Sequence, residues 1–303
     1  MQDYMIRTTA ANGRIRVFIA QAGGLVEEAR KIHQTTPVAT AALGRLLIAG
    51  TMMGVMLKGE HDELTLRIQG NGPIGTMIVT ADSLGGVRGY IANPGADVPP
   101  KSPGKLDVGK AVGTGSLTVI RDMGLKEPYS GQVELVSGEI AEDLTYYFAS
   151  SEQVPSSVAL GVLVEKDYHV RSAGGMIIQL MPDAGDEIID ELENTLKELP
   201  PITKLLEEGM RPEDILERTL GSFKPEAPEK IPVCYRCTCS QERVERAVLS
   251  LPRKELREMI SEGNPLEIKC DFCKKSYEIP VERLKQMLEA ALASRFKIID
   301  GEN

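Results

Sequence analysis

Cys234-Tyr235-Arg236-Cys237-Thr238-Cys239 and Cys270-Asp271-Phe272-Cys273 contain all 5 cysteines of this 303-residue chain. In a reducing cytosol, clustered cysteines bind metal or do redox chemistry more often than they form structural disulfides. Zinc binds four thiolates tetrahedrally, and two cysteines a few residues apart can present both sulfurs from one turn. We therefore predict a four-cysteine zinc site in the C-terminal part of the chain. The 3 histidines lie far away in sequence, at His33, His61 and His169.

Spacing leaves the choice of metal ligands open, because the first group of cysteines has three sulfurs for two ligand positions. The common C-x2-C…C-x2-C pattern would select Cys234, Cys237, Cys270 and Cys273. The gap between the two groups is about 30 residues, longer than in a simple zinc ribbon. Residues 244–251 and 256–260 within this gap have helical patterns.

The charge distribution divides the chain into three segments. Residues 1–182 carry 16 basic and 18 acidic side chains, residues 183–230 carry 6 and 14, and residues 231–303 carry 13 and 12. Nearly all of the net charge of −9 therefore lies in the middle segment. We predict an N-terminal core domain at 1–182, an acidic helical linker at 183–230 and a C-terminal zinc-binding domain at 231–303.

The first segment has the mixed pattern of an α+β domain. Residues 14–19 alternate with period two after the turn pair Asn12-Gly13, which indicates a β-hairpin. Similar strand patterns occupy residues 64–68 and 76–79 on either side of Asn71-Gly72. Helices are expected at residues 25–33, 39–57 and from 138 to about 150.

The middle segment has the pattern of short amphipathic helices. Apolar side chains recur at three- and four-residue spacing from Ile188 to Leu199, and Pro200-Pro201 ends this helix. Two shorter helices are expected at residues 202–206 and 211–220. Isolated helices shorter than about 12–15 residues are marginal in water, so the segment requires a packing partner. Residues 221–232 contain three prolines and are expected to form a loop.

Composition excludes several classes of protein. A net charge of −9, an aromatic content of 4% and the absence of Trp disfavour a nucleic-acid binder. Residues 1–20 lack the apolar run of a secretory signal. The longest uncharged apolar stretch, residues 46–57, is far shorter than the roughly 20 residues of a membrane span and is expected to be a buried helix. We predict a cytoplasmic protein with no nucleic-acid or membrane partner.

Several runs point to one known family. The runs are Cys237-Thr238-Cys239-Ser240-Gln241-Glu242-Arg243, Cys270-Asp271-Phe272-Cys273, Gly138-Glu139-Ile140-Ala141-Glu142-Asp143-Leu144, Ser151-Glu152-Gln153 with Pro155-Ser156, and Ala173-Gly174-Gly175 before Gln179 and Pro182. Together they resemble the 33 kDa heat-shock protein family, which are redox-regulated bacterial holdase chaperones. The resemblance extends over essentially the whole chain.

The resemblance implies one zinc ion per chain, held by Cys237, Cys239, Cys270 and Cys273 in a reduced, inactive state. Oxidation is then expected to form the disulfides Cys237–Cys239 and Cys270–Cys273, to release zinc and to free the linker. The apolar stripe of the linker would bind unfolding client proteins without ATP. The family also implies dimerisation on oxidation and transfer of clients to ATP-dependent chaperones. Cys234 departs from the family pattern and offers Cys237 an alternative disulfide partner.

Two other functions remain as alternatives from the residues alone: a zinc-ribbon nucleic-acid-binding protein and a thiol–disulfide oxidoreductase. The near-neutral C-terminal segment disfavours the first, and the position of C-x-x-C outside a βαβ unit disfavours the second. No P-loop or nucleophile-elbow motif is present in the sequence. We predict no enzymatic activity, no catalytic residue and no organic cofactor, and we expect Glu139, Glu142 and Asp143 to form a solvated helix face.

Overall fold

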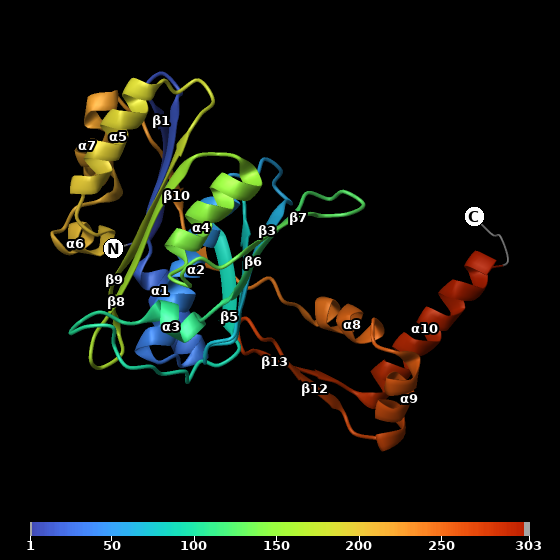
Figure 1. Ribbon diagram of the computed structural model, residues 1–303. Helices are drawn as coiled ribbons and strands as arrows, with labels where there is room; N and C mark the ends of the chain where they lie inside the picture. The colour runs from blue at the N-terminus through green and yellow to red at the C-terminus, as the bar shows by residue number, and fades with distance from the viewer. Residues whose placement is uncertain (1, 300–303) are drawn as a thin grey trace. The chain divides into compact units, whose positions relative to one another are not determined.

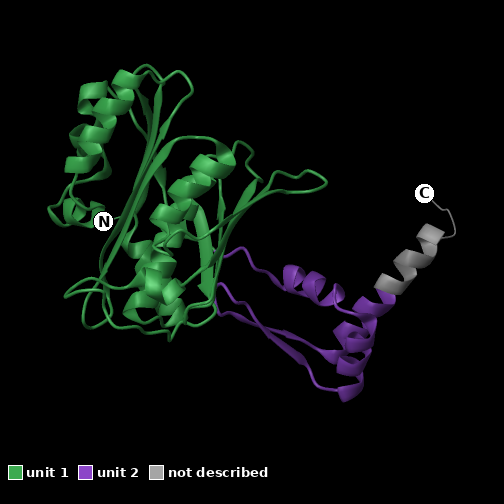
Figure 2. Cartoon of the chain, in the orientation of Figure 1, with its two compact units in different colours: residues 1–236 green, residues 237–303 purple. Residues whose placement is uncertain are grey.

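The computed structural model describes the backbone of residues 2–299 and the side chains of residues 2–290. The chain forms two compact units, residues 1–236 and residues 237–303 (Figures 1 and 2). The first unit contains two β-sheets and most of the helices, and the second contains one β-hairpin and three helices. This mixture confirms the predicted α+β fold class.

One sheet of the first unit has five antiparallel strands in the order β10-β1-β2-β9-β8. Asn12 and Gly13 adopt φ angles of 55° and 82° in the β1–β2 turn, which confirms the predicted hairpin. The strands span Tyr4–Ala10 (β1), Ile15–Gln21 (β2), Ser156–Val164 (β8), Val170–Leu180 (β9) and Glu229–Pro232 (β10).

The other sheet has six strands in the order β11-β5-β4-β3-β6-β7. Adjacent strands in this sheet are antiparallel, except that the two-residue strand β11 runs parallel to β5. The strands span Glu63–Gly70 (β3), Thr76–Asp82 (β4), Gly86–Ile91 (β5), Gly115–Asp122 (β6), Tyr129–Glu134 (β7) and Cys234–Tyr235 (β11).

Helix α2 (Pro37–Gly54) forms the centre of the core and packs against strands of both sheets. Thr36 caps its first turn by accepting a hydrogen bond from the Ala39 amide, and Pro37 occupies the first helical position. By length and hydropathy α2 meets the criterion for a membrane span, but 89% of it is buried within the unit, as in the core helix of a globular domain. The remaining elements of this region are α1 (Gly23–His33), α3 (Val108–Val112), α4 (Ala141–Tyr147) and a π-helical turn at Phe148–Glu152.

The acidic segment covers the outer face of the five-stranded sheet, as Figure 1 shows in yellow and orange. It contains α5 (Asp186–Glu198), α6 (Ile202–Glu207), α7 (Pro212–Leu220) and a 3-10 turn at Gly221–Phe223. On β2, Val17 and Ile19 pack against these helices, whereas Phe18 and Ala20 point into the core that contains α2. The predicted helices are confirmed, and their packing partner is this sheet.

Two details of the sequence analysis were wrong. Residues 229–232, expected in a loop, form β10 and pair with β1. Glu139 and Asp143, expected on a solvated face, are not solvated: Asp143 is fully buried and Glu139 is paired with Arg45. The local sequence pattern did not indicate β10 or the ion pair of Glu139, because their partners lie far away along the chain. It did not indicate the burial of Asp143, because the amides that bind its carboxylate belong to the turn before the helix.

The second unit is small. Among its side chains up to residue 290, five are buried in its core: Val248, Leu256, Ile279, Leu284 and Met287. They come from α8 (Gln241–Leu249), α9 (Arg253–Glu262), the hairpin of β12 (Leu266–Lys269) and β13 (Ser276–Ile279), and the first part of α10 (Val281–Ile299). A core of this size offers little apolar burial for a unit of this length.

Candidate metal centre

The second cysteine pair lies in a tight turn between β12 and β13. The Lys274 amide donates to the Cys270 carbonyl at 2.8 Å, and the Cys270 amide donates to the Lys275 carbonyl at 2.9 Å. Lys274 adopts a left-handed φ of 60°, which reverses the chain within the turn. The turn therefore brings Cys270 and Cys273 to one site, as their C-x-x-C spacing predicts.

The first pair precedes helix α8 directly. Ser240 caps α8, since its Oγ accepts a hydrogen bond from the Arg243 amide at 3.2 Å. The Arg243 guanidinium also donates to Thr238 Oγ1 at 2.6 Å, between the two cysteines. The cap and this hydrogen bond hold Cys237-Thr238-Cys239 in one conformation at the start of the helix.

The sulfurs of Cys237, Cys239, Cys270 and Cys273 all lie within 4.8 Å of one another. The Cys237–Cys270 sulfur distance is 3.8 Å and the Cys239–Cys273 distance is 3.4 Å. A tetrahedral ion with Zn–S bonds of about 2.3 Å requires sulfurs about 3.8 Å apart. All four side chains are half-buried, and a set of four thiols is the donor set that zinc prefers. These cysteines can therefore hold a metal ion.

Tyr277 on β13 contributes to the same cluster. The residue is buried, and its hydroxyl group donates a hydrogen bond to Cys239 Sγ at 2.9 Å. This hydrogen bond raises the pKa of Tyr277, so the phenol keeps its proton and remains a donor. Burial opposes ionisation of Cys239, but the hydrogen bonds from Tyr277 and from the neighbouring thiols lower its pKa to about 7. The sequence analysis did not identify Tyr277, whose only signal was its position four residues after Cys273.

The pKa values of two other thiols in the cluster are raised rather than lowered. Burial raises the pKa of Cys237 and of Cys273 above the ordinary value for a thiol. In the absence of metal these two sulfurs therefore keep their protons at neutral pH. A metal ion that binds here must displace those protons, so its affinity depends on pH.

Cys234 is not part of the group of four. It lies in β11 of the first unit, paired with Gly86 of β5, and its side chain is exposed. The C-x2-C spacing would have made Cys234 a ligand in place of Cys239. In the structure the sulfur of Cys239, not that of Cys234, lies with Cys237, Cys270 and Cys273.

A family model described as "Hsp33 protein" matches residues 3–280. The chain belongs to the Hsp33 family. It is 55% identical over 288 residues to the 33 kDa chaperonin of Lachnoclostridium phytofermentans, covering 95% of this chain and 99% of that protein. It is 51% identical over 290 residues to the 33 kDa chaperonin of Clostridioides difficile, with 95% and 99% covered.

A solved structure is similar over the whole fold. The crystal structure of the 33 kDa chaperonin (heat shock protein 33 homolog) from Thermotoga maritima superposes with a TM-score of 0.88 at 40% sequence identity. The match covers 97% of this chain and 100% of that one. The resemblance noted from the sequence is thus confirmed, both for the family and for the α+β fold.

Proposed function

We propose that this protein is a redox-regulated, ATP-independent holdase chaperone that prevents aggregation of unfolding proteins under oxidative stress. The observation that carries the proposal is the group of four thiols whose sulfurs all lie within 4.8 Å of one another, close to the separation of sulfurs around a zinc ion. The similarity to proteins named 33 kDa chaperonins supports the chaperone activity. We place its action in the cytoplasm, where the reduced thiols would be maintained.

In the reduced state Cys237, Cys239, Cys270 and Cys273 would hold one zinc ion, which keeps the sulfurs as thiolates and links the β12–β13 turn to the start of α8. Thiolates are the form that peroxide attacks. Each pair would form one disulfide, losing two electrons to the oxidant, which is reduced to water. A sulfur in a disulfide no longer ligates metal, so the small second unit would lose its main support.

We propose Cys237–Cys239 and Cys270–Cys273 as the disulfides. Closing a short loop costs less entropy than closing a loop of about 30 residues. Two close sulfur contacts of the cluster also join the two pairs, Cys239 with Cys273 at 3.4 Å and Cys237 with Cys270 at 3.8 Å. Peptide mapping of the oxidised protein distinguishes the two arrangements, and a Cys234–Cys237 bond would appear in the same map.

The client-binding surface would be the apolar face of the acidic segment. Ile202, Leu205, Ile215, Leu216 and Leu220 are buried against the five-stranded sheet. Once this segment detaches, these side chains and the sheet beneath them would be available to exposed apolar surfaces of clients. We further propose dimerisation of the oxidised form and transfer of clients to ATP-dependent chaperones.

The test combines metal content with chaperone activity. Reduced protein should contain one zinc ion per chain, and peroxide should release it while suppression of aggregation of a heat-unfolded model enzyme appears. Cys270→Ser should abolish tight zinc binding, whereas the matched variant Cys234→Ser should keep one ion per chain. Equal suppression by the reduced, zinc-loaded protein would contradict the redox regulation, and loss of zinc in Cys234→Ser but not in Cys239→Ser would contradict the ligand set.

A further inference from the structure

The turn before α4, residues 136–140, is held by several hydrogen bonds to one buried carboxylate and lies in the first unit, outside the cysteine cluster. The buried carboxylate of Asp143 accepts hydrogen bonds from the amides of Val136, Ser137 and Gly138 at 2.8, 2.9 and 3.2 Å, and from that of Ile140 at 2.8 Å. Ile140 has a φ of 72°, a conformation that a β-branched residue rarely adopts. Backbone held in this way is frequent at binding and catalytic sites.

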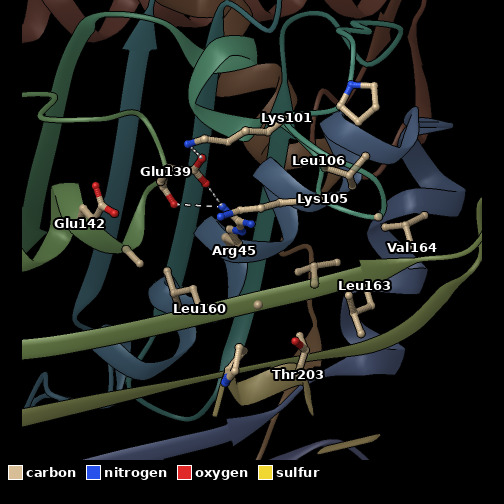
Figure 3. A pocket seen from close by; sticks show the side chains of 16 residues that line it. Arg45, Lys101, Lys105, Leu106, Glu139, Glu142, Leu160, Leu163, Val164 and Thr203 are labelled. Atoms are coloured by element: carbon tan, nitrogen blue, oxygen red, sulfur yellow. Dashed lines mark hydrogen bonds and ion pairs between the residues drawn. The ribbon is translucent and has the colours of Figure 1, made fainter. Parts of the chain in front are cut away.

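The turn positions Glu139 in a charged cluster. Glu139 Oε2 accepts a hydrogen bond from Arg45 Nη1 of α2 at 2.7 Å, and Lys101 Nζ lies 3.7 Å from Glu139 Oε1 (Figure 3). The Arg45 and Glu139 side chains are only 16% and 17% exposed. Two polar atoms here, Arg45 Nε and Glu139 Oε1, are buried without a hydrogen-bond partner, out of three such side-chain atoms in the described residues. Buried polar atoms without partners are uncommon in folded proteins and call for a functional explanation.

The cluster forms one side of a cavity of about 620 Å³. Lys105 also points into this cavity, as Figure 3 shows, and Glu142 completes the charged lining. Three cationic and two anionic side chains give the lining an excess of one positive charge. Leu160 and Val164 of β8, with Leu106, form an apolar wall, and Thr203 of α6 and the preceding Pro201 complete the lining.

We propose that this cavity binds a small organic anion. Its carboxylate or phosphate head would lie beside Lys101 and Lys105, and its apolar body would lie along β8. Arg45 is largely buried, whereas Lys101 and Lys105 are exposed at the mouth of the cavity. The lysines can therefore reach the head group, and the less screened charge of Arg45 adds to the attraction from the interior. The site goes beyond the proposed function and requires neither zinc nor oxidation. Because α6 forms part of the wall, the bound anion also stabilises α6 on the sheet.

The experiment is calorimetric titration of reduced, full-length protein with hexyl phosphate and with hexanoate. Inorganic phosphate and hexanol test the head group and the apolar body separately. We expect saturable 1:1 binding of at least one amphipathic anion, and the tighter of the two identifies the head group. Lys101→Gln and Lys105→Gln should each weaken binding by about tenfold, as for the loss of a charged hydrogen bond. Lys126→Gln, an exposed lysine in the β6–β7 turn, is the matched control and should bind as the parent does.

Four results would overturn the proposal. The first two are a lack of saturable binding of either anion, and binding of the anion by the Lys101→Gln and Lys105→Gln variants with the affinity of the parent protein. The other two are binding of inorganic phosphate as tight as that of hexyl phosphate, and binding of hexanol as tight as that of either anion. Amide exchange provides an independent measurement. Saturating ligand should slow exchange in α6 by the factor 1 + [L]/Kd. Binding without any slowing in α6 would refute the placement of the ligand against Thr203.

Discussion

Leu205→Ala should loosen the acidic segment without disturbing the metal centre. Leu205 is fully buried where α6 packs on the five-stranded sheet, among the side chains of the outer apolar cluster. Truncation of a buried leucine to alanine costs about 2–5 kcal/mol, since apolar contacts are lost and a cavity remains. Helix propensity does not offset this loss, because alanine and leucine are both strong helix formers.

The substitution lowers the free energy required for local opening of the acidic segment. A loss of 2 kcal/mol, the lower limit, multiplies the open population by roughly 30, at about tenfold for each 1.4 kcal/mol. Amide exchange of α5, α6 and α7, measured by mass spectrometry on reduced, zinc-loaded protein, should therefore accelerate by at least this factor. Limited proteolysis at residues 183–230 should accelerate in parallel, and under the proposed function the variant should suppress client aggregation at a lower dose of oxidant.

Lys204→Ala is the matched control, because Lys204 is exposed on the same helix. It should exchange at the parental rate. The reasoning would be refuted if Leu205→Ala left exchange in α5–α7 unchanged. It would equally be refuted if exchange rose to the same extent in β3 and β4 of the other sheet, since the segment would then open only together with the whole unit.

Three further predictions concern the second unit. If the proposed zinc ion is bound, its removal by a chelator under reducing conditions should abolish amide protection in α8, α9 and the β12–β13 hairpin but not in α2. A structural zinc contributes on the order of 10–16 kcal/mol, and the described side chains of this unit form a core of only five buried residues. Protection that persists after metal analysis has confirmed the loss of zinc would contradict this prediction. Tyr277→Phe should accelerate peroxide-driven release of the proposed zinc ion by about tenfold or more, because the thiolate of Cys239 loses a hydrogen bond worth about 1.5–3 kcal/mol. The control Tyr235→Phe, in the first unit, should release zinc at the parental rate. Zinc affinity, measured by competition with a chromogenic chelator, should fall at least about a hundredfold per pH unit between pH 8 and pH 6. The raised pKa values of Cys237 and Cys273 keep both thiols protonated without metal, so two protons compete with the metal ion. An affinity independent of pH would show that these thiols are already ionised.

Helices and hairpins that depend on neighbouring residues could be predicted from the amino-acid pattern. The three- and four-residue spacing of apolar side chains identified α5, α6 and α7, and Asn12-Gly13 identified the first hairpin, because both signals act within a few residues. The site was partly accessible in the same way. Two short-range cysteine motifs predict a metal site, although spacing alone did not decide between Cys234 and Cys239.

Contacts between distant residues were decided by the tertiary structure. β10 was missed because its partner β1 lies more than 200 residues earlier, and no local pattern encodes such a pairing. Cys237 meets Cys270, and Cys239 meets Cys273, across 33 and 34 residues that only the fold brings together. The partner of Glu139 is also distant: Arg45 lies 94 residues earlier, and the ion pair removes Glu139 from the solvated face that its local pattern predicted. Local patterns record the conformational preference of a segment, whereas burial and partner choice depend on the free energy of packing that segment against the rest of the chain.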